Sequence, residues 1–143
     1  GDKKSISLEL LTPILSMQNI AFLDLQYNDT NDEREKFFKN NGIKINKIEN
    51  IDNLNDIDGL TSLIEMCDFV ITVSNTNAHI SGALGKETFL LLPKGKAKLW
   101  YWSSLNNRCI WYSSVRIIEQ QKIDNWDNSI EKLEKIIEEK TNG

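Results

Sequence analysis

The stretch FVITVSNTNAHISGALGKETFLLLP, residues 69–93, constrains the fold of this chain more than any other part of the sequence. Its ends, FVITV and TFLLL, are short, rich in β-formers and apolar on both faces, as strands are when helices cover both sides of a parallel sheet. Between them lies a polar turn, followed by small residues that we expect to form a helix. Two strands joined by a helix form a parallel βαβ unit, so we expect an α/β fold.

The rest of the chain alternates between strand and helix patterns in the same way. Further strands are predicted at 19–26, 43–49 and 114–118, and helices at 7–17, 31–42, 59–67 and 125–140. We expect Pro13 to break the first of these helices and Asp58 to cap the third. The pattern predicts a Rossmann-like, doubly wound fold with a mainly parallel sheet of about five strands and helices on both faces. The last helix has an apolar stripe that consists of Trp126, Ile130, Leu133 and Ile137.

Length and composition narrow the class of protein. The chain has 143 residues, so residues 1–143 are predicted to form a single domain with one core. A formal net charge of −4 without a basic patch argues against a nucleic-acid partner. Cys67 and Cys109 have no metal-ligand spacing, and no apolar run is long enough for a membrane span or for the core of a signal peptide. We therefore expect a cytoplasmic protein with no membrane span.

The polar turn after FVITV is the candidate ligand site. In doubly wound sheets ligands bind beyond the carboxyl ends of the strands, and the usual strand order would place Gln26 next to this turn. A turn that opens a helix presents unpaired N–H groups at the positive end of the helix dipole, which suits a phosphate group. The predicted binding residues are Gln26, Ser74, Asn75, Thr76, Asn77 and His79, the only histidine.

The same turn has a simpler interpretation. Asn and Thr are common helix caps, so these side chains would only cap the helix while His79 fills a polar gap. The small residues Ser81, Gly82, Ala83 and Gly85 would let the helix approach the sheet closely. No Ser-His-Asp set, metal cluster or Walker loop is present, so the sequence suggests no metal and no cofactor.

The segments NIAFLDLQY, DIDGLTSLIEMCDFVITVSNTNAHISGALGKETFLLLP, LWYW and WYSSVRIIEQ resemble the C-terminal half of heptosyltransferase-like glycosyltransferases, especially those that follow tetratricopeptide repeats in bacterial proteins. The resemblance covers nearly the whole chain. It implies the donor-binding domain of a GT-B enzyme, in which two Rossmann-like domains face each other. It also implies that Ser74, Asn75 and Thr76 bind phosphate, that His79 matches the family's helix histidine and that Gln26 reaches the diphosphate.

The chain departs from the family pattern in two places. Many members have an Asp-Thr pair where this chain has Ser74 and Asn75, and several have a lysine where it has Tyr27 and Asn28. Lys94, Lys96 and Lys98 are candidates to replace that cation. The aromatic residues at 100–102 and 111–112 are candidates to stack on a base or sugar, or to pack under a long loop.

The function indicated by the resemblance is binding of a nucleotide-diphosphate sugar for an inverting, metal-independent glycosyltransferase. We expect His79 to act as a neutral hydrogen-bond donor. The catalytic base would come from the missing N-terminal GT-B or tetratricopeptide-repeat region, so this chain alone would bind a donor without turnover. The alternative is a non-catalytic nucleotide- or sugar-binding module or scaffold derived from that family. A flavodoxin-like domain would need an acidic pocket or a flavin loop, and neither is evident.

Overall fold

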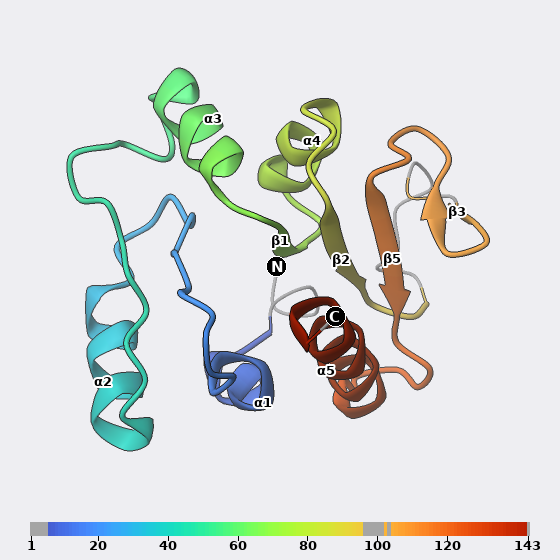
Figure 1. Ribbon diagram of the computed structural model, residues 1–143, viewed down its shortest axis with the longest axis horizontal. Helices are drawn as coiled ribbons and strands as arrows, with labels where there is room; N and C mark the ends of the chain where they lie inside the picture. Colours follow the sequence, from blue (N-terminus) through green and yellow to red (C-terminus); the bar gives the residue numbers. More distant parts are fainter. Residues whose placement is uncertain (1–5, 96–101, 103, 143) are drawn as a thin grey trace.

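The structure is a computed structural model that describes residues 6–95, 102 and 104–142. Three parallel strands form one side of the sheet, from its edge strand inward (Figure 1). They are β1 (Val70–Val73), β2 (Thr88–Leu92) and β5 (Val115–Glu119). Their registers pair Val70 with Thr88 and Thr88 with Val115. All three strands were predicted from their apolar patterns, and these predictions are confirmed.

A short hairpin extends the sheet beyond β5. It consists of β3 (Ser104–Leu105) and β4 (Arg108–Cys109), and both strands are antiparallel to their neighbours. Asn106 and Asn107 have φ values of 53° and 63°, as a tight two-residue hairpin turn requires. The sheet order is β1-β2-β5-β4-β3, so the predicted α/β class with about five strands is confirmed, while the sheet as a whole is mixed.

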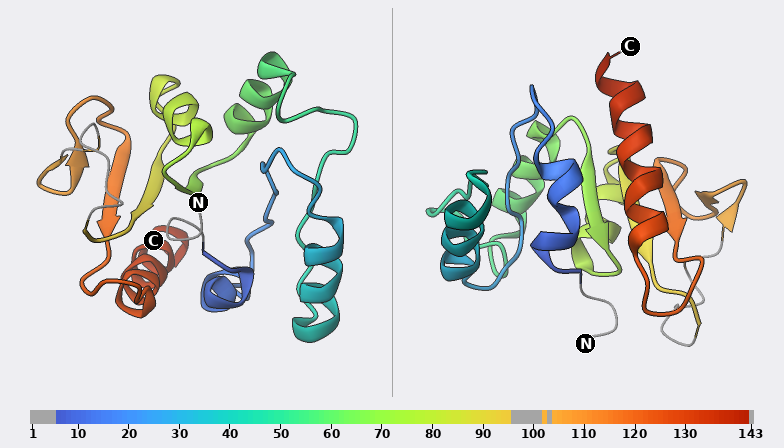
Figure 2. Two further views of the ribbon diagram at one scale, coloured as in Figure 1. Left: turned by 180° about the vertical axis from the view of Figure 1, so that it is seen from behind. Right: turned by 90° about the horizontal axis from the view of Figure 1, so that it is seen from below.

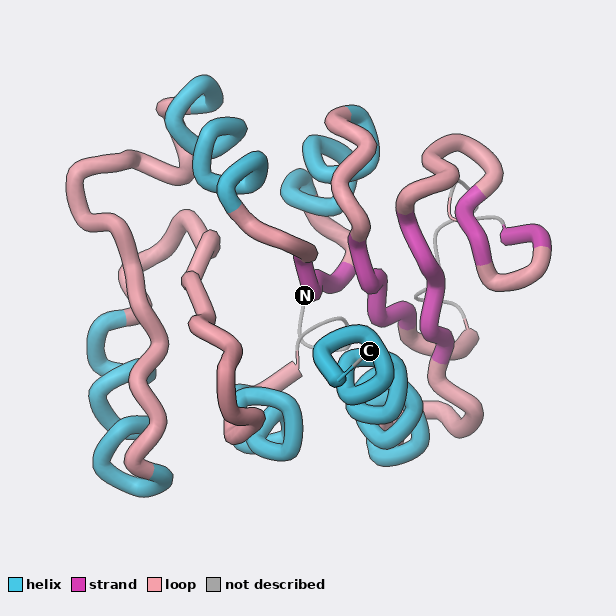
Figure 3. Tube along the Cα trace, viewed as in Figure 1, coloured by secondary structure: helices cyan, strands magenta, loops and turns pink. Residues whose placement is uncertain are grey.

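The two strands predicted at 19–26 and 43–49 are not strands of this sheet, and Figure 3 shows both as loops. They meet in a single parallel bridge between Leu23 and Asn46. The Asp24 N–H donates to the Asn46 carbonyl at 2.7 Å, and the Asn46 N–H donates to the Phe22 carbonyl at 2.9 Å. Beyond this bridge, the Asp24 carboxylate accepts from the Gln26 N–H at 2.8 Å. Such a local side-chain bond turns the backbone away from a ladder, which explains why the prediction was wrong here.

Helices lie on both faces of the sheet (Figures 1 and 2). On one face lie α1 (Thr12–Leu15), which follows the 3-10 turn η2 (Leu8–Leu11), and α5 (Asp127–Asn142). On the other face lie α3 (Ile57–Met66) and α4 (Thr76–Ala83). The remaining helix, α2 (Asn31–Asn41), lies beside the two extended segments, away from the sheet. Doubly wound architecture is therefore confirmed.

The helix ends follow local sequence rules. Pro13 lies in the first turn of α1, where a proline is tolerated; the 3-10 turn ends at Leu11 and α1 begins at Thr12, so the helical form changes next to Pro13 and the predicted break is not a gap in the helix. The predicted cap Asp58 is wrong: Asp56 caps α3, and its carboxylate accepts from the Gly59 N–H at 2.8 Å. Asp58 is already inside the first helical turn and cannot occupy the cap position. Gly42 ends α2 with φ of 68°.

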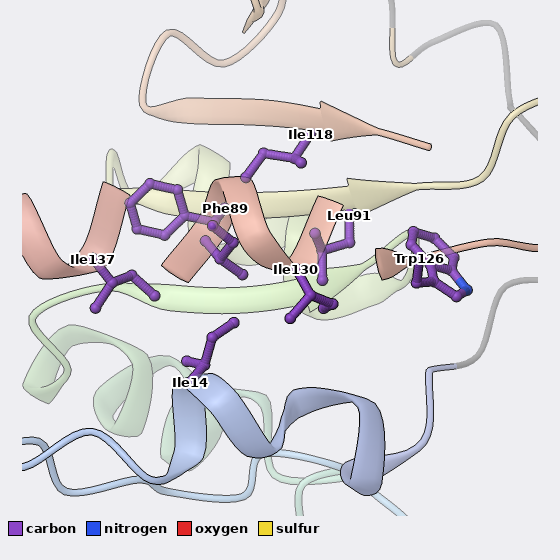
Figure 4. Close-up of a cluster of buried hydrophobic side chains, with 8 residues drawn as sticks. Ile14, Phe89, Leu91, Ile118, Trp126, Ile130 and Ile137 are labelled. Carbon is purple, nitrogen blue, oxygen red and sulfur yellow. The ribbon is translucent and has the colours of Figure 1, made fainter. Parts of the chain in front are cut away.

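The largest cluster of buried apolar side chains lies between the sheet and α5 (Figure 4). The predicted stripe of α5 is buried in it, and Ile14 of α1 reaches the same cluster. The buried members are Ile14, Phe89, Leu91, Ile118, Trp126, Ile130, Leu133 and Ile137. A second cluster on the opposite face contains Leu90, Leu92, Ile117, Ala78 and Trp102. In the described part of the chain, no helix has the length and apolar character needed to cross a membrane.

Candidate functional site

A cleft of about 950 Å³ lies between the extended segment 19–26 and β1. β1 pairs only with β2 among the described strands, so its other edge faces this cleft. Gln26, Asn75 and Asn77 line it. The Asn77 side chain donates to the Leu25 carbonyl at 3.2 Å, which links the first turn of α4 directly to the end of the extended segment. The predicted approach of Gln26 to this turn is therefore confirmed, although no sheet ladder produces it.

The turn that opens α4 is ordered by Asn75. Its side-chain oxygen accepts from the Ala78 N–H at 3.2 Å, and Thr72 Oγ1 lies 3.0 Å from the same oxygen. Asn75 is thus the helix cap that the simpler interpretation expected. The N–H groups of Thr76 and Asn77, at the first two helical positions, have no acceptor inside the helix. Because Thr76 is exposed, the turn can present these donors and the Thr76 hydroxyl to an anion.

Two of the predicted residues lie on the other flank of the turn. The Trp102 indole N–H donates to the Ser74 hydroxyl at 2.8 Å. The His79 ring stacks on Trp102 with centroids 4.7 Å apart, and His79 Nδ1 lies 3.3 Å from the Tyr112 hydroxyl. Ser74, Thr76 and His79 are not among the residues that line the cleft, although the Thr76 side chain is exposed next to it, between Asn75 and Asn77. The predicted binding residue His79 therefore lies outside this cleft, with its ring packed against this aromatic pair.

The small residues of α4 allow this packing. A Cβ added at Gly82 would lie 2.5 Å from Cγ of Tyr112, so only glycine lets the ring rest on the helix. Ser81 is also fully buried, whereas Ala83 is exposed and Gly85 ends the helix with φ of 70°. The predicted close approach holds for Ser81 and Gly82, but at Gly82 the neighbour is Tyr112 and not the sheet.

The aromatic segment has two different surroundings. Trp102 is completely buried, whereas Trp111 is mostly exposed and Tyr112 is half-buried. Trp100 and Tyr101 lie outside the described residues. Trp102 and Tyr112 pack in the apolar cluster with Ala78 of α4 and Leu90 of β2, and this packing supports Ser74 and His79.

A buried polar cluster beside Gln26 was not predicted. Its centre is Asp24, which is 8% exposed. The Asp24 carboxylate accepts from the Thr30 hydroxyl, and it lies 3.7 Å from Arg34 Nε and 4.0 Å from Lys47 Nζ. The one available signal was an aspartate inside the apolar run AFLDL, since a charged residue is rarely buried without partners.

The lysines after β2 do not supply the expected cation in the described part of the chain. The Lys94 ammonium donates to the Gln121 carbonyl at 2.8 Å, and its backbone N–H donates to the Gln120 side chain at 3.0 Å. Lys96 and Lys98 lie outside the described residues. Lys47 instead brings an ammonium group to the end of the first extended segment, 3.0 Å from the Gln26 carbonyl.

One thiol lines the cleft. Burial raises the pKa of the Cys67 thiol, Lys86 opposes this rise and Asp68 adds to it. Its Sγ donates to the Leu63 carbonyl at 3.3 Å. Within the described ranges, no set of three His, Cys, Asp or Glu side chains is arranged to bind a metal ion. The polar residues that line the cleft are amides and hydroxyls together with charged groups, which are Asp24, Glu33, Arg34, Asp68 and Lys140.

These features define a doubly wound α/β domain with a ligand-sized cleft at an open strand edge. Comparison with known proteins adds one relative, Protein FlbA from Caulobacter vibrioides, which is 29% identical over 119 residues. The matched region is 82% of this chain but only 19% of FlbA, so the chain spans about a fifth of that protein's length. No family model matches the chain, and no solved structure matches it significantly.

Proposed function

We propose that this domain binds a nucleotide-diphosphate sugar as the donor-binding half of an inverting, metal-independent glycosyltransferase. The observation that carries the proposal is the convergence of Gln26, Asn75 and Asn77 with the first turn of α4 at one cleft. Its volume of about 950 Å³ suits a ligand of this size. The resemblance to heptosyltransferase-like enzymes supports the same class of ligand.

The proposed chemistry is displacement at the anomeric carbon by an acceptor hydroxyl. The N–H groups of Thr76 and Asn77 and the dipole of α4 would stabilise the charge that develops on the departing diphosphate. Gln26, Asn75, Thr76 and Asn77 would contact the ligand, whereas Ser74 and His79 would support the turn through Trp102 and Tyr112. The base that takes the acceptor proton would come from the region of a longer protein that faces this cleft. We place such a protein in the cytoplasm. The partners of this domain would be the facing region of the longer protein and the nucleotide-diphosphate sugar.

The second candidate is a non-catalytic nucleotide- or sugar-binding module. It is favoured by the Asn75 cap and by the packing of His79, because both side chains already have structural contacts. Both candidates predict donor binding by this domain. They differ in turnover, which a longer protein that includes this domain would show only under the first proposal.

Titration with a panel of nucleoside diphosphates and their sugars tests donor binding by this domain, which both candidates predict. Calorimetry and amide chemical shifts measure the binding. Thr76→Ala should weaken binding of the best ligand by about 1 kcal/mol or more, roughly fivefold, because it removes a hydrogen bond to a charged group. Stability should change less than affinity, since the Thr76 side chain is exposed. The matched control is Thr61→Ala, which removes the same hydroxyl from α3, away from the turn that opens α4. If Thr76→Ala unfolds the domain and no diphosphate shifts the turn amides, Thr76 only stabilises the helix start and the proposal fails.

A further inference from the structure

Three side chains from three parts of the chain fix the backbone of Gln26. The Asp24 carboxylate accepts from the Gln26 N–H at 2.8 Å. The Gln26 carbonyl accepts from Lys47 Nζ at 3.0 Å and from the Asn53 side chain at 3.1 Å. Meanwhile Gln26 is exposed and lines the cleft. The backbone is thus fully hydrogen-bonded on the protein side, which leaves the side chain for a ligand.

Of these three side chains, Lys47 makes the most hydrogen bonds to residues 26–30. Besides Gln26, its ammonium donates to the Asn28 carbonyl at 2.9 Å and lies 3.4 Å from the Thr30 hydroxyl. An ammonium group has three donors, and these three acceptors match that number. The Lys47 side chain is only 11% exposed, and Asp24 at 4.0 Å offsets its charge. One side chain therefore connects both ends of the turn at 26–30.

Apart from Lys47, other side chains hold the two ends of this turn: Asp24 and Asn53 bond the Gln26 backbone, and the buried Thr30 hydroxyl donates to Asp24. Tyr27, Asn28 and Asp29 are exposed, and regular hydrogen bonding resumes only at the start of α2, where the Arg34 N–H donates to the Thr30 carbonyl. Without Lys47 the backbone of the turn would gain conformational freedom, and a ligand that contacts Gln26 would have to order it again on binding.

We propose that Lys47, assisted by Asp24 and Asn53, is a positioning residue that orders Gln26 for the diphosphate of the ligand. The inference rests on the proposed function for the identity of the ligand. The ordering of the turn is a separate claim that needs no ligand for its test. Lys47 acts through Gln26 and does not itself contact the ligand.

A double-mutant cycle tests this role. Lys47→Met should weaken binding of the nucleoside diphosphate that binds wild type best by about tenfold, the size expected for one hydrogen bond to a charged group. In a Gln26→Ala background the same change should cause no further loss, because the group that Lys47 positions is gone. Lys44→Met, an exposed lysine in the same segment, is the matched control and should have little effect. An equal loss with and without Gln26 would show that Lys47 acts by its charge and would overturn the proposal, as would no loss at all.

Hydrogen exchange of the ligand-free protein supplies the second measurement. Lys47→Met should speed exchange at the Gln26 N–H, which donates to the Asp24 carboxylate at the start of the turn, and leave the amides of β2 and β5 unchanged. If Lys47→Met does not fold, Asn53→Ala removes a different donor to the same carbonyl and should give the same pattern. Unchanged exchange at the turn would overturn the positioning role even if nucleotides bind. Faster exchange at the turn in a protein whose wild type binds no diphosphate would instead refute the proposed function and leave the ordering role standing.

Discussion

The two halves of the molecule are stabilised in different ways. In residues 57–142, as far as the structure describes them, β1, β2 and β5 pair in a regular parallel ladder between two layers of helices. In residues 6–56, two extended segments meet in one bridge, and polar side chains make many of the remaining connections. The open edge of β1 and the cleft lie where the two halves meet.

This difference separates scaffold from site. In a strand ladder with a buried apolar cluster, the backbone moves little when a surface residue is substituted. In a segment that is ordered by a few side chains, substitution of one of them can change the backbone conformation. The candidate ligand contacts come from both kinds of structure. Asn75 and Asn77 extend from the regular half, and Gln26 extends from the polar one. Substitutions in one half therefore test whether the two halves are stabilised independently.

The largest effect is expected from the apolar half. Phe89→Ala should lower the free energy of unfolding by about 3–5 kcal/mol, because it leaves a cavity where a fully buried ring now packs edge-to-face on Phe69. Chemical denaturation measures this loss. Phe38→Ala on α2 is the matched control, since that ring is 53% exposed, and its effect should stay within about 0.5 kcal/mol. Similar losses for the two variants would mean that the core does not lie where the structure places it.

A smaller and more local effect is expected in the polar half. Asp24→Asn should cost about 2 kcal/mol, because Arg34 and Lys47 would lose the carboxylate that offsets their charge. Hydrogen exchange should speed up around residues 22–30 and change little in β2 and β5. Asp32→Asn, at an exposed position of α2, is the control. Equal acceleration in β2 would contradict the division, since it would show that the two halves unfold together.

The same division explains what the sequence could predict. FVITV and TFLLL were recognised as strands because burial on both faces leaves a mostly apolar run, and SVRII was added as one more β-rich segment. The segment at 19–26 has an apolar run and the segment at 43–49 alternates apolar and polar residues, as strands do, but Asp24 and Asn46 bond to backbone groups and the two segments meet in one bridge. Apolar periodicity reports burial and not hydrogen-bond partners, so it could not distinguish these cases.

The candidate site was predicted in part for a related reason. The polar turn and the end of the first extended segment were placed together by the strand-order rule, and Asn77 joins them in the structure. The position of His79 depends on Trp102 and Tyr112, which are more than twenty residues away in the sequence. The role of Lys47 depends likewise on carbonyl groups, which carry no sequence signal. Contacts between residues far apart in the sequence, and contacts to backbone carbonyls, can be identified only in the structure.

The smallest expected effect is at Cys67, which lies at the boundary between the halves and lines the cleft. Burial raises the pKa of its thiol above the ordinary value of 9.0, so the folded protein binds this proton more tightly than the unfolded chain does. The resulting stabilisation is complete below the unfolded pKa and is lost as pH rises through the folded pKa. In a Cys109→Ser background, thiolate absorbance should therefore rise at higher pH in the folded than in the denatured protein, and iodoacetamide should react more slowly with the folded form. A ligand that fills the cleft should slow this reaction further. A folded thiol that titrates together with the denatured one would show that the cleft wall at Cys67 is open to water, and that the two halves are less closely joined than the structure describes.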